Sequence, residues 1–213
     1  MNRASRRAAL TALGVLGSGL LRESLTARPD SPRFYRLGLA TAATWTVGGF
    51  ACGPPRFAAR GRSRDALLAP LTGAVAFGVF TSGALVARRI PMLDRAIRHV
   101  LRYSRGSSMT RPLLIALVSG AAEEIFFRGP VYETAGRHPV VVSTGVYCLA
   151  TTATRNPALI LAAAVMGTLL GVQRRATGGI RAPILTHLTW STLMVCGLPA
   201  LFSADGGLTH VVT

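Results

Sequence analysis

Long uncharged apolar segments dominate this chain, and short clusters of charged residues separate them. Half of the 213 residues are hydrophobic and only 15% are charged. This layout is typical of a protein that crosses a membrane several times. Because isolated strands leave backbone groups unpaired in lipid, the pattern predicts an all-α fold, a polytopic membrane helical bundle.

The apolar segments predict about six transmembrane helices in a membrane-embedded domain over residues 36–203. Four of them begin at or next to a proline, whose missing N–H has no partner at a helix start anyway. Gly167 and Gly171 form a G-x-x-x-G pair that permits close helix packing. The six segments are Leu37–Gly53, Ala66–Ala87, Pro112–Phe127, Pro139–Thr154, Pro157–Gln173 and Ala182–Phe202.

Residues 1–35 form a basic segment ahead of this domain, and residues 204–213 form a C-terminal tail. The apolar stretch Ala8–Leu21 is too short to cross a bilayer, so we expect a short interfacial or re-entrant helix there. Ser5-Arg6-Arg7 ahead of it resembles a twin-arginine export signal. The following Leu25-Thr26-Ala27 is a poor cleavage site, which favours retention of the segment.

Residues Pro91–Ser104 predict an amphipathic helix at the membrane surface, with a soluble connector helix as the alternative. One face carries apolar side chains, and the other carries arginines that can reach lipid phosphates. The apolar face consists of Leu93, Ile97, Val100 and Leu101, and the basic face consists of Arg95, Arg98 and Arg102.

The net charge of +16 comes entirely from arginine, because the chain contains no lysine. The arginines lie between the apolar segments and are not interleaved with aromatic residues. We therefore expect contact with anionic lipid headgroups and no nucleic-acid partner. If residues 1–35 do not cross the membrane, the arginine distribution favours both termini in the cytoplasm.

Two adjacent carboxylates, Glu123 and Glu124, stand near the end of an uncharged apolar segment. An ionisable group within a membrane segment is costly and suggests function. Glu124 and Arg128 are four residues apart, so a helix places them on one face as an ion pair. Glu123 lies about 100° around the helix and is free to exchange a proton. The alternative is an interfacial ion pair with Glu123 facing water.

A second polar group lies in the last apolar segment, where His187 and Ser191 are four residues apart. A single histidine on an apolar helix is more often a packing residue than a catalyst. If the third and sixth helices touch, however, His187 meets Glu123 and Glu124 in one cavity. A carboxylate that activates water beside a histidine that polarises a carbonyl is peptidase chemistry.

These residues resemble the CPBP family of intramembrane proteases, the CAAX-protease and bacteriocin-processing family. The stretch EEIFFR at residues 123–128 matches its E-E-x-x-x-R motif, and GTLLGVQRRATGGIRAPILTHLTWS at residues 167–191 is similar to its last conserved region. The likeness covers residues 112–200. It implies a multi-pass endopeptidase of the bacterial cytoplasmic (plasma) membrane, acting on a membrane protein or peptide.

The resemblance also implies roles for the site residues. Glu123 corresponds to the general base that activates water, and Glu124 and Arg128 are supporting residues. His187 is a site histidine on the oxyanion side, followed by Ser191 where the family has Asn or Asp. The chain departs further from the family's middle F-x-x-x-H motif, because Thr151 or Thr152 stands where the histidine is expected.

The missing histidine also bears on cofactors. Glu123, Glu124 and His187 supply three metal ligands at most, and Arg128 occupies one carboxylate. We therefore expect no cofactor and disfavour a divalent metal such as zinc. The three cysteines, Cys52, Cys148 and Cys196, lie in apolar segments and predict neither a disulfide framework nor a zinc site.

The sequence thus favours an enzyme, an intramembrane endopeptidase that hydrolyses a peptide bond with glutamate-activated water. The alternative is a catalytically impaired relative that acts as a binding, immunity-like or scaffold membrane protein. A small transporter or channel component gated by the Glu124–Arg128 pair is a third reading, and the likeness of residues 182–187 to the family's A-P-I-L-x-H segment argues against it.

Overall fold

The computed structural model describes residues 2–57, 62–104 and 109–203, and within these ranges the chain is helical with no strand. The predicted all-α class is confirmed. The predicted tail at 204–213 lies outside the described residues. The main helices are α1 (Arg3–Thr26), α2 (Pro32–Ala51), α3 (Arg62–Ala87), α4 (Pro91–Leu101), α5 (Thr110–Phe126), α7 (Pro139–Thr152), α8 (Pro157–Thr177) and α9 (Arg181–Ser203). Short turns η1 (Arg102–Ser104), η2 (Phe127–Val131) and α6 (Tyr132–Thr134) complete them.

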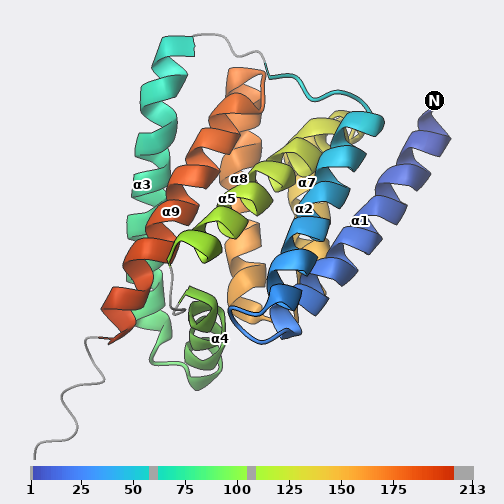
Figure 1. The fold of residues 1–213 in the computed structure, drawn as a ribbon. Coiled ribbons are helices and arrows are strands. Elements are labelled where there is room, and N and C mark those ends of the chain that lie inside the picture. The colour runs from blue at the N-terminus through green and yellow to red at the C-terminus, as the bar shows by residue number, and fades with distance from the viewer. Residues whose placement is uncertain (1, 58–61, 105–108, 204–213) are drawn as a thin grey trace, which may run out of the picture.

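Three helix pairs surround α5 (Figure 1). Helices α1 and α2 pack as an antiparallel pair, α7 packs against α8, and α3 packs against α9, which is distant in sequence. Helix α5 contacts both α2 and α9. A residue on α5 therefore faces side chains from both halves of the chain.

Each of the six predicted apolar segments forms a helix, but six membrane crossings are not confirmed. Two helices of the described part are long and apolar enough to cross a membrane, Leu67–Ala87 within α3 and Pro157–Thr177. Helix α7 is apolar but shorter. Gly167 and Gly171 lie against Thr144 and Val140 of α7, so the predicted close packing at this pair is confirmed.

Apolar side chains on the outward faces of α3 and α8 support a lipid surrounding. Both helices expose large aliphatic residues at helical spacing along one side, whereas a soluble monomer rarely exposes a continuous apolar patch of this extent. On α3 these residues are Leu67, Leu71, Val75 and Val79, and on α8 they are Leu161, Val165 and Val172.

Helix α1 is longer than the apolar stretch predicted, because it continues through polar residues on both sides. Asn2 caps its start by accepting a hydrogen bond from the Ser5 N–H at 2.8 Å. Helix propensity does not require an apolar side chain, so counting only the apolar stretch underestimated the helix. The N-terminal segment is therefore a full member of the bundle and not a short surface helix.

The position of α1 places the N-terminus in the bundle. Arg6 at its start forms an ion pair with Glu133, so the N-terminus lies at the end of the bundle where η2 and α6 lie. Helix α9 ends at the opposite end (Figure 1). The two helices of the described part that are long and apolar enough to cross a membrane do not include α1, so the prediction that both termini lie in the cytoplasm stays a prediction.

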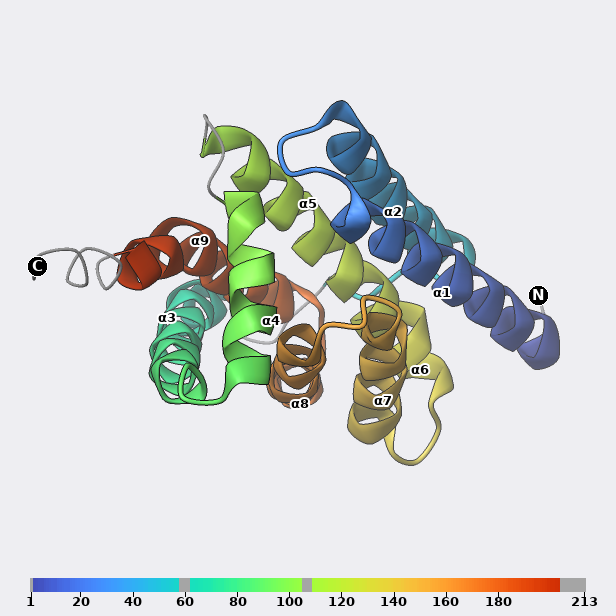
Figure 2. The ribbon, with the colours of Figure 1, turned by 90° about the horizontal axis from the view of Figure 1, so that it is seen from below.

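The predicted amphipathic helix is present as α4, followed by η1. Figure 2 shows α4 lying across one end of the bundle, over the ends of α3, α8 and α9. The apolar face of α4 is turned inward, and Arg95 and Arg98 of α4 and Arg102 of η1 are exposed. Tyr103 then anchors this region to the α1–α2 turn, because its hydroxyl contacts the carbonyl oxygens of Leu25 and Ala27.

The core between α1, α2 and α5 is built on Trp45, which is 1% exposed. Its indole lies against Phe126 and Phe127, with ring centroids 6.5 and 5.3 Å away. On the other side it lies against the bare Cα of Gly17, where an added Cβ would come within 2.2 Å of the indole Nε1. Glycine at this position thus sets how closely α1 approaches α2.

Replacing Gly17 by alanine is expected to lower the free energy of unfolding by roughly 1–3 kcal/mol, because the new methyl group overpacks the Trp45 site. Gly19→Ala is the matched control, since an added Cβ there meets nothing within 4 Å. Helix propensity alone predicts that it stabilises the protein by up to about 1 kcal/mol. Denaturation in detergent, followed by circular dichroism, measures both. Equal stability of the two variants would contradict the α1–α2 contact.

Candidate functional site

A break at the end of α5 positions the first site residue, Arg128. The next segment, η2, is a π-helical turn in which Gly129 leaves helical geometry (φ −86°, ψ −116°) and Pro130 supplies no N–H. Arg128 is fully buried inside this turn. Its guanidinium lies over the ring of Tyr147 on α7, 4.8 Å from the ring centroid.

Glu124 on α5 is the hub of the site. It is fully buried, and its Oε1 accepts a hydrogen bond from Arg128 Nη1 at 3.1 Å. The same oxygen lies 2.9 Å from His187 Nδ1 on α9. Because an ionised carboxylate only accepts, His187 donates its Nδ1–H here and directs Nε2 away from Glu124. One carboxylate thereby fixes both an arginine and the orientation of an imidazole ring.

Small residues bring α9 close enough for this contact. The His187 ring packs against Gly120 of α5, where an added Cβ would lie 3.3 Å from the ring. Thr186 anchors α9 to α3 by donating a hydrogen bond to the Ala69 carbonyl at 2.9 Å. Gly73 of α3 allows that approach, since a Cβ there would lie 2.6 Å from the Thr186 carbonyl oxygen.

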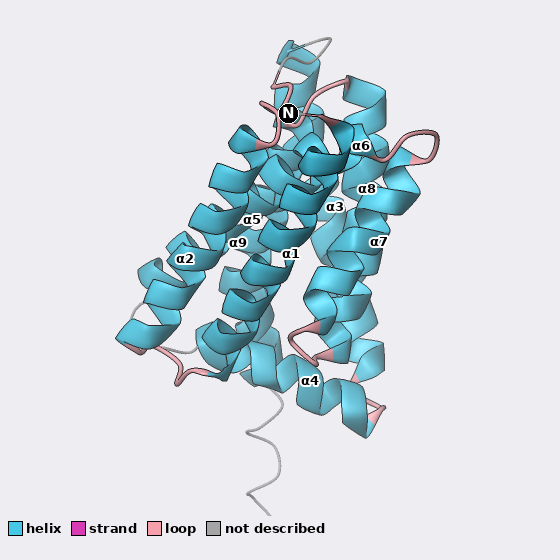
Figure 3. Cartoon of the chain, turned by 90° about the vertical axis from the view of Figure 1, so that its right-hand side faces the viewer, coloured by secondary structure: helices cyan, strands magenta, loops and turns pink. Residues whose placement is uncertain are grey.

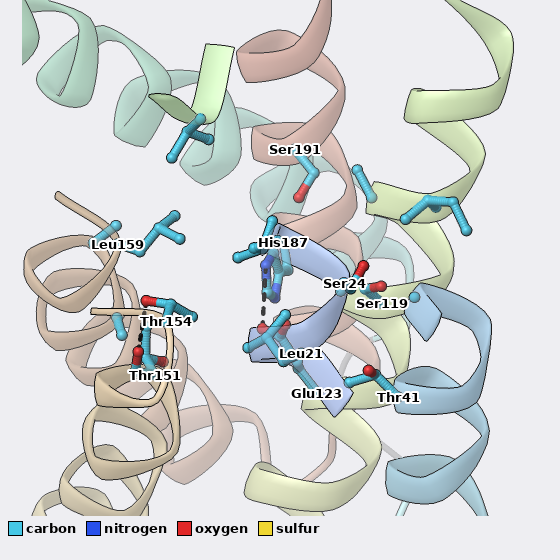
Figure 4. Close-up of a pocket in the computed structure, with 18 of the residues that line it drawn as sticks. Leu21, Ser24, Thr41, Ser119, Glu123, Thr151, Thr154, Leu159, His187 and Ser191 are labelled. Carbon is cyan, nitrogen blue, oxygen red and sulfur yellow. Dashed lines mark hydrogen bonds and ion pairs between the residues drawn. The ribbon is translucent and has the colours of Figure 1, made fainter. Parts of the chain in front are cut away.

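Glu123 faces the other ring nitrogen. Its Oε2 accepts a hydrogen bond from the Tyr147 hydroxyl at 2.6 Å and lies 4.0 Å from His187 Nε2. Figure 4 shows Glu123 and His187 joined by a dashed line at the centre of a cavity. The two adjacent glutamates thus differ. Glu124 contacts Nδ1 of His187, and Glu123 lies on the cavity side of the ring, near Nε2.

The cavity has a volume of about 230 Å³ and receives residues from α1, α2, α4, α5, α7, α8 and α9. Glu123, His187 and Ser191 line it together with Tyr147 and Thr151. The rest of its wall combines apolar side chains with the hydroxyl residues Ser24, Thr41, Ser119 and Thr154. A water-sized or peptide-sized group here meets one carboxylate, one imidazole and several hydroxyl-bearing side chains between apolar ones.

The structure brings together all five residues singled out in the sequence, namely Glu123, Glu124, Arg128, His187 and Ser191. It also separates the two candidate threonines: Thr151 is buried and lines the cavity, whereas Thr152 is exposed. Of the two threonines, only Thr151 therefore faces the cavity. Its hydroxyl donates to the Tyr147 carbonyl at 2.8 Å.

Sequence reasoning missed Tyr147 as a site residue. Tyr147 precedes Thr151 by four residues, so both lie on one face of α7, and that spacing was the available signal. Its bond to Glu123 joins helices far apart in sequence, and no local pattern shows such a contact. Trp190 was missed in the same way and lies beside His187, with ring centroids 5.8 Å apart.

The donor set does not fit a metal ion well. Glu124 Oε1 is shared by Arg128 and His187 Nδ1, which leaves Glu123 and His187 Nε2 as donors on the cavity side. Among the described residues, no group of three His, Cys, Asp or Glu side chains is arranged to hold a metal. Structural and catalytic zinc sites use three or four protein ligands.

In a comparison with protein families, a family described as type II CAAX prenyl endopeptidase Rce1-like matches residues 106–193. This Rce1-like segment contains all five predicted site residues, and it confirms the resemblance to the CPBP proteases. No curated protein and no solved structure matches the chain.

Arg174, inside the Rce1-like segment, holds the η2 turn from outside. The Tyr132 N–H bonds to the carbonyls of Phe127 and Gly129. The Arg128 carbonyl instead accepts a hydrogen bond from Arg174 Nε at 3.1 Å. Arg174 is only 5% exposed and also pairs with Glu133 at 3.5 Å. It is a positioning residue, because it fixes the backbone of the residue that binds Glu124.

Replacing Arg174 by methionine is expected to lower the free energy of unfolding by about 1.5–3 kcal/mol, because the buried Arg128 carbonyl loses a charged donor. Arg175→Met is the control, since Arg175 is exposed on the next position of α8. Denaturation of both variants in detergent measures the difference. If Arg175→Met destabilises as much, loss of charge and not the η2 contact is responsible.

Proposed function

We propose that this protein is an intramembrane endopeptidase in which Glu123 activates water for attack on a peptide bond. The observation that carries the proposal is the pairing of Glu123 with His187 across one cavity. The two side chains come from α5 and α9, and a partner holds each of them: Tyr147 for Glu123 and Glu124 for His187. A base and a polarising group fixed 4.0 Å apart suit acyl transfer to water.

The contacts support a division of roles. Tyr147 donates to Oε2 of Glu123, which leaves Oε1 to accept a proton from water. A charged His187 donates from Nδ1 to Glu124 and from Nε2 toward the cavity. Glu124, paired with Arg128 at 3.1 Å, would stabilise the imidazolium. The Ser191 hydroxyl is a further donor in the cavity wall.

In the proposed reaction the water oxygen bonds to the carbonyl carbon while its proton passes to Glu123. The carbonyl oxygen gains negative charge, which His187 Nε2–H and the Ser191 hydroxyl stabilise. The C–N bond then breaks as Glu123 returns the proton to the leaving nitrogen. The products are a carboxylic acid and an amine, and Glu123 is again a carboxylate. No step uses a metal ion.

The surroundings of the site favour an apolar substrate segment. A second cavity of about 250 Å³ shares Trp190 and Ser191 with the first, and its remaining wall is almost entirely apolar. Phe80, Met194 and Leu198 lie along it. We propose a membrane protein or peptide with apolar side chains beside the cleaved bond. The family description names a CAAX prenyl endopeptidase, and the proposed substrate does not require a prenyl group.

We place the protein in the bacterial cytoplasmic membrane as a multi-pass protein, in keeping with its Rce1-like segment and its two long apolar helices. A non-catalytic role in binding is the second candidate. The observation in its favour is that Thr151, one of the two threonines at the histidine position that the resemblance predicts, lines the cavity. Threonine has no imidazole with which to accept a proton at neutral pH.

Glu123→Gln and His187→Ala are expected to reduce peptide-bond cleavage by roughly 10²–10⁴-fold, because each removes a group that acts on the reacting atoms. Purified protein in detergent, tested on a library of apolar peptides, measures this. Thr152→Val is the control, because Thr152 is exposed outside the cavity. Chelator is expected to leave the wild-type rate unchanged. If wild type cleaves no more peptide than Glu123→Gln does, while an active relative cleaves the same library, the binding role is favoured.

Thr151→His is expected to increase the cleavage rate at least about tenfold, because it restores an imidazole in the cavity wall. Thr152→His places the same residue one position further, on the exposed face of α7, and is expected to leave the rate unchanged. Comparing kcat for the two variants on one peptide tests the assignment of Thr151. Equal rates in both would show that Thr151 does not occupy the histidine position.

A further inference from the structure

The end of the bundle at which α1 begins carries more arginines than carboxylates. Glu133 there pairs with Arg6 at 3.5 Å, Arg56 at 3.7 Å and Arg174 at 3.5 Å. Three guanidinium groups share one carboxylate, so the cluster keeps a net positive charge. Among the side chains that the structure describes, no other carboxylate forms an ion pair with these three arginines. The local field therefore attracts anions.

A groove of about 310 Å³ opens beside this cluster, between α1, α7 and the η2–α6 turn. Figure 3 shows α1 and α7 as neighbours along this face. Arg7 and Thr11 line the groove from one face of α1, and Thr134 lines it from α6. The rest of its wall is apolar and consists of Leu10, Val131, Ala135, Val142 and Val146.

The polar and apolar parts of the groove are ordered along the bundle. Arg7 lies near the start of α1, and Leu10 lies almost one turn further in. Helix α7 begins at the same end, so Val142 and then Val146 lead inward along the opposite wall. Arg7 is exposed and forms no ion pair with another described residue. A free guanidinium thus stands at the mouth of an apolar trough.

We propose that this groove binds an anionic phospholipid, with its phosphate at Arg7 and an acyl chain along Val142 and Val146. The net positive charge of the arginine cluster favours a headgroup with negative charge on its phosphate. The apolar wall selects a lipid over free phosphate, because only a lipid covers it. The bound lipid would also contact Val131 in η2, the segment that carries Arg128.

Titration of detergent-purified protein with phosphatidylglycerol, followed by native mass spectrometry, tests the site. Wild type is expected to bind phosphatidylglycerol in preference to phosphatidylcholine. Arg7→Gln is expected to weaken binding roughly fivefold, the effect of one arginine at a lipid surface. Arg3→Gln, one turn earlier and outside the groove, is the control and is expected to bind as wild type does.

A second pair of variants tests the apolar wall. Val142→Phe fills the groove and is expected to weaken binding, whereas Val141→Phe lies on the exposed side of α7 and is expected to have no effect. Equal loss in Arg3→Gln and Arg7→Gln would overturn the proposal, since it indicates diffuse surface attraction. Unchanged binding in Arg7→Gln, or competition by millimolar inorganic phosphate, would also overturn it. None of these outcomes depends on peptidase activity.

Discussion

The buried carboxylate of Glu124 is the contact on which the arrangement of this site depends. A charge removed from solvent is stable only if it is paired and hydrogen-bonded, and Glu124 finds an arginine and a histidine on the same oxygen. Arg128 comes from the η2 turn after α5, and His187 comes from α9. Because the Glu124 charge needs partners from both places, the break after α5 and the packing of α5 against α9 depend on each other.

The break in α5 is itself supported from outside. Within the π-helical turn, the Arg128 carbonyl accepts a hydrogen bond from Arg174 of α8. The arginine also reaches Glu133, so the turn is tied to the charge cluster that holds the start of α1. The end of the bundle and the cavity thus share one polar network, although the cavity wall is largely apolar. Movement of η2 would disturb both.

Close helix approaches at glycine give the site its dimensions. Gly120 lets the imidazole lie flat on α5, and Gly73 lets α9 approach α3 at Thr186. Gly167 allows α8 to pack on α7 beside Tyr147, with an added Cβ only 3.4 Å from that ring. Because a packed interior has little free volume, each glycine fixes a separation that a larger residue would increase. Tyr147, Glu123 and His187 meet as a consequence.

The sequence by itself determined the helices and the catalytic candidates. Apolar segments between arginines predicted helices at all six positions. The four-residue spacings of Glu124–Arg128 and His187–Ser191 predicted shared helix faces, because residue spacing along the chain fixes the face on which a helical side chain lies. It did not determine the length of α1, since polar residues form helices too. Only the tertiary structure decided that Tyr147 holds Glu123, that Thr151 and not Thr152 lines the cavity, and that Arg174 supports the η2 turn. Each of these is a contact between helices far apart in sequence, and such contacts depend on packing distances and facing directions that local residue patterns do not encode.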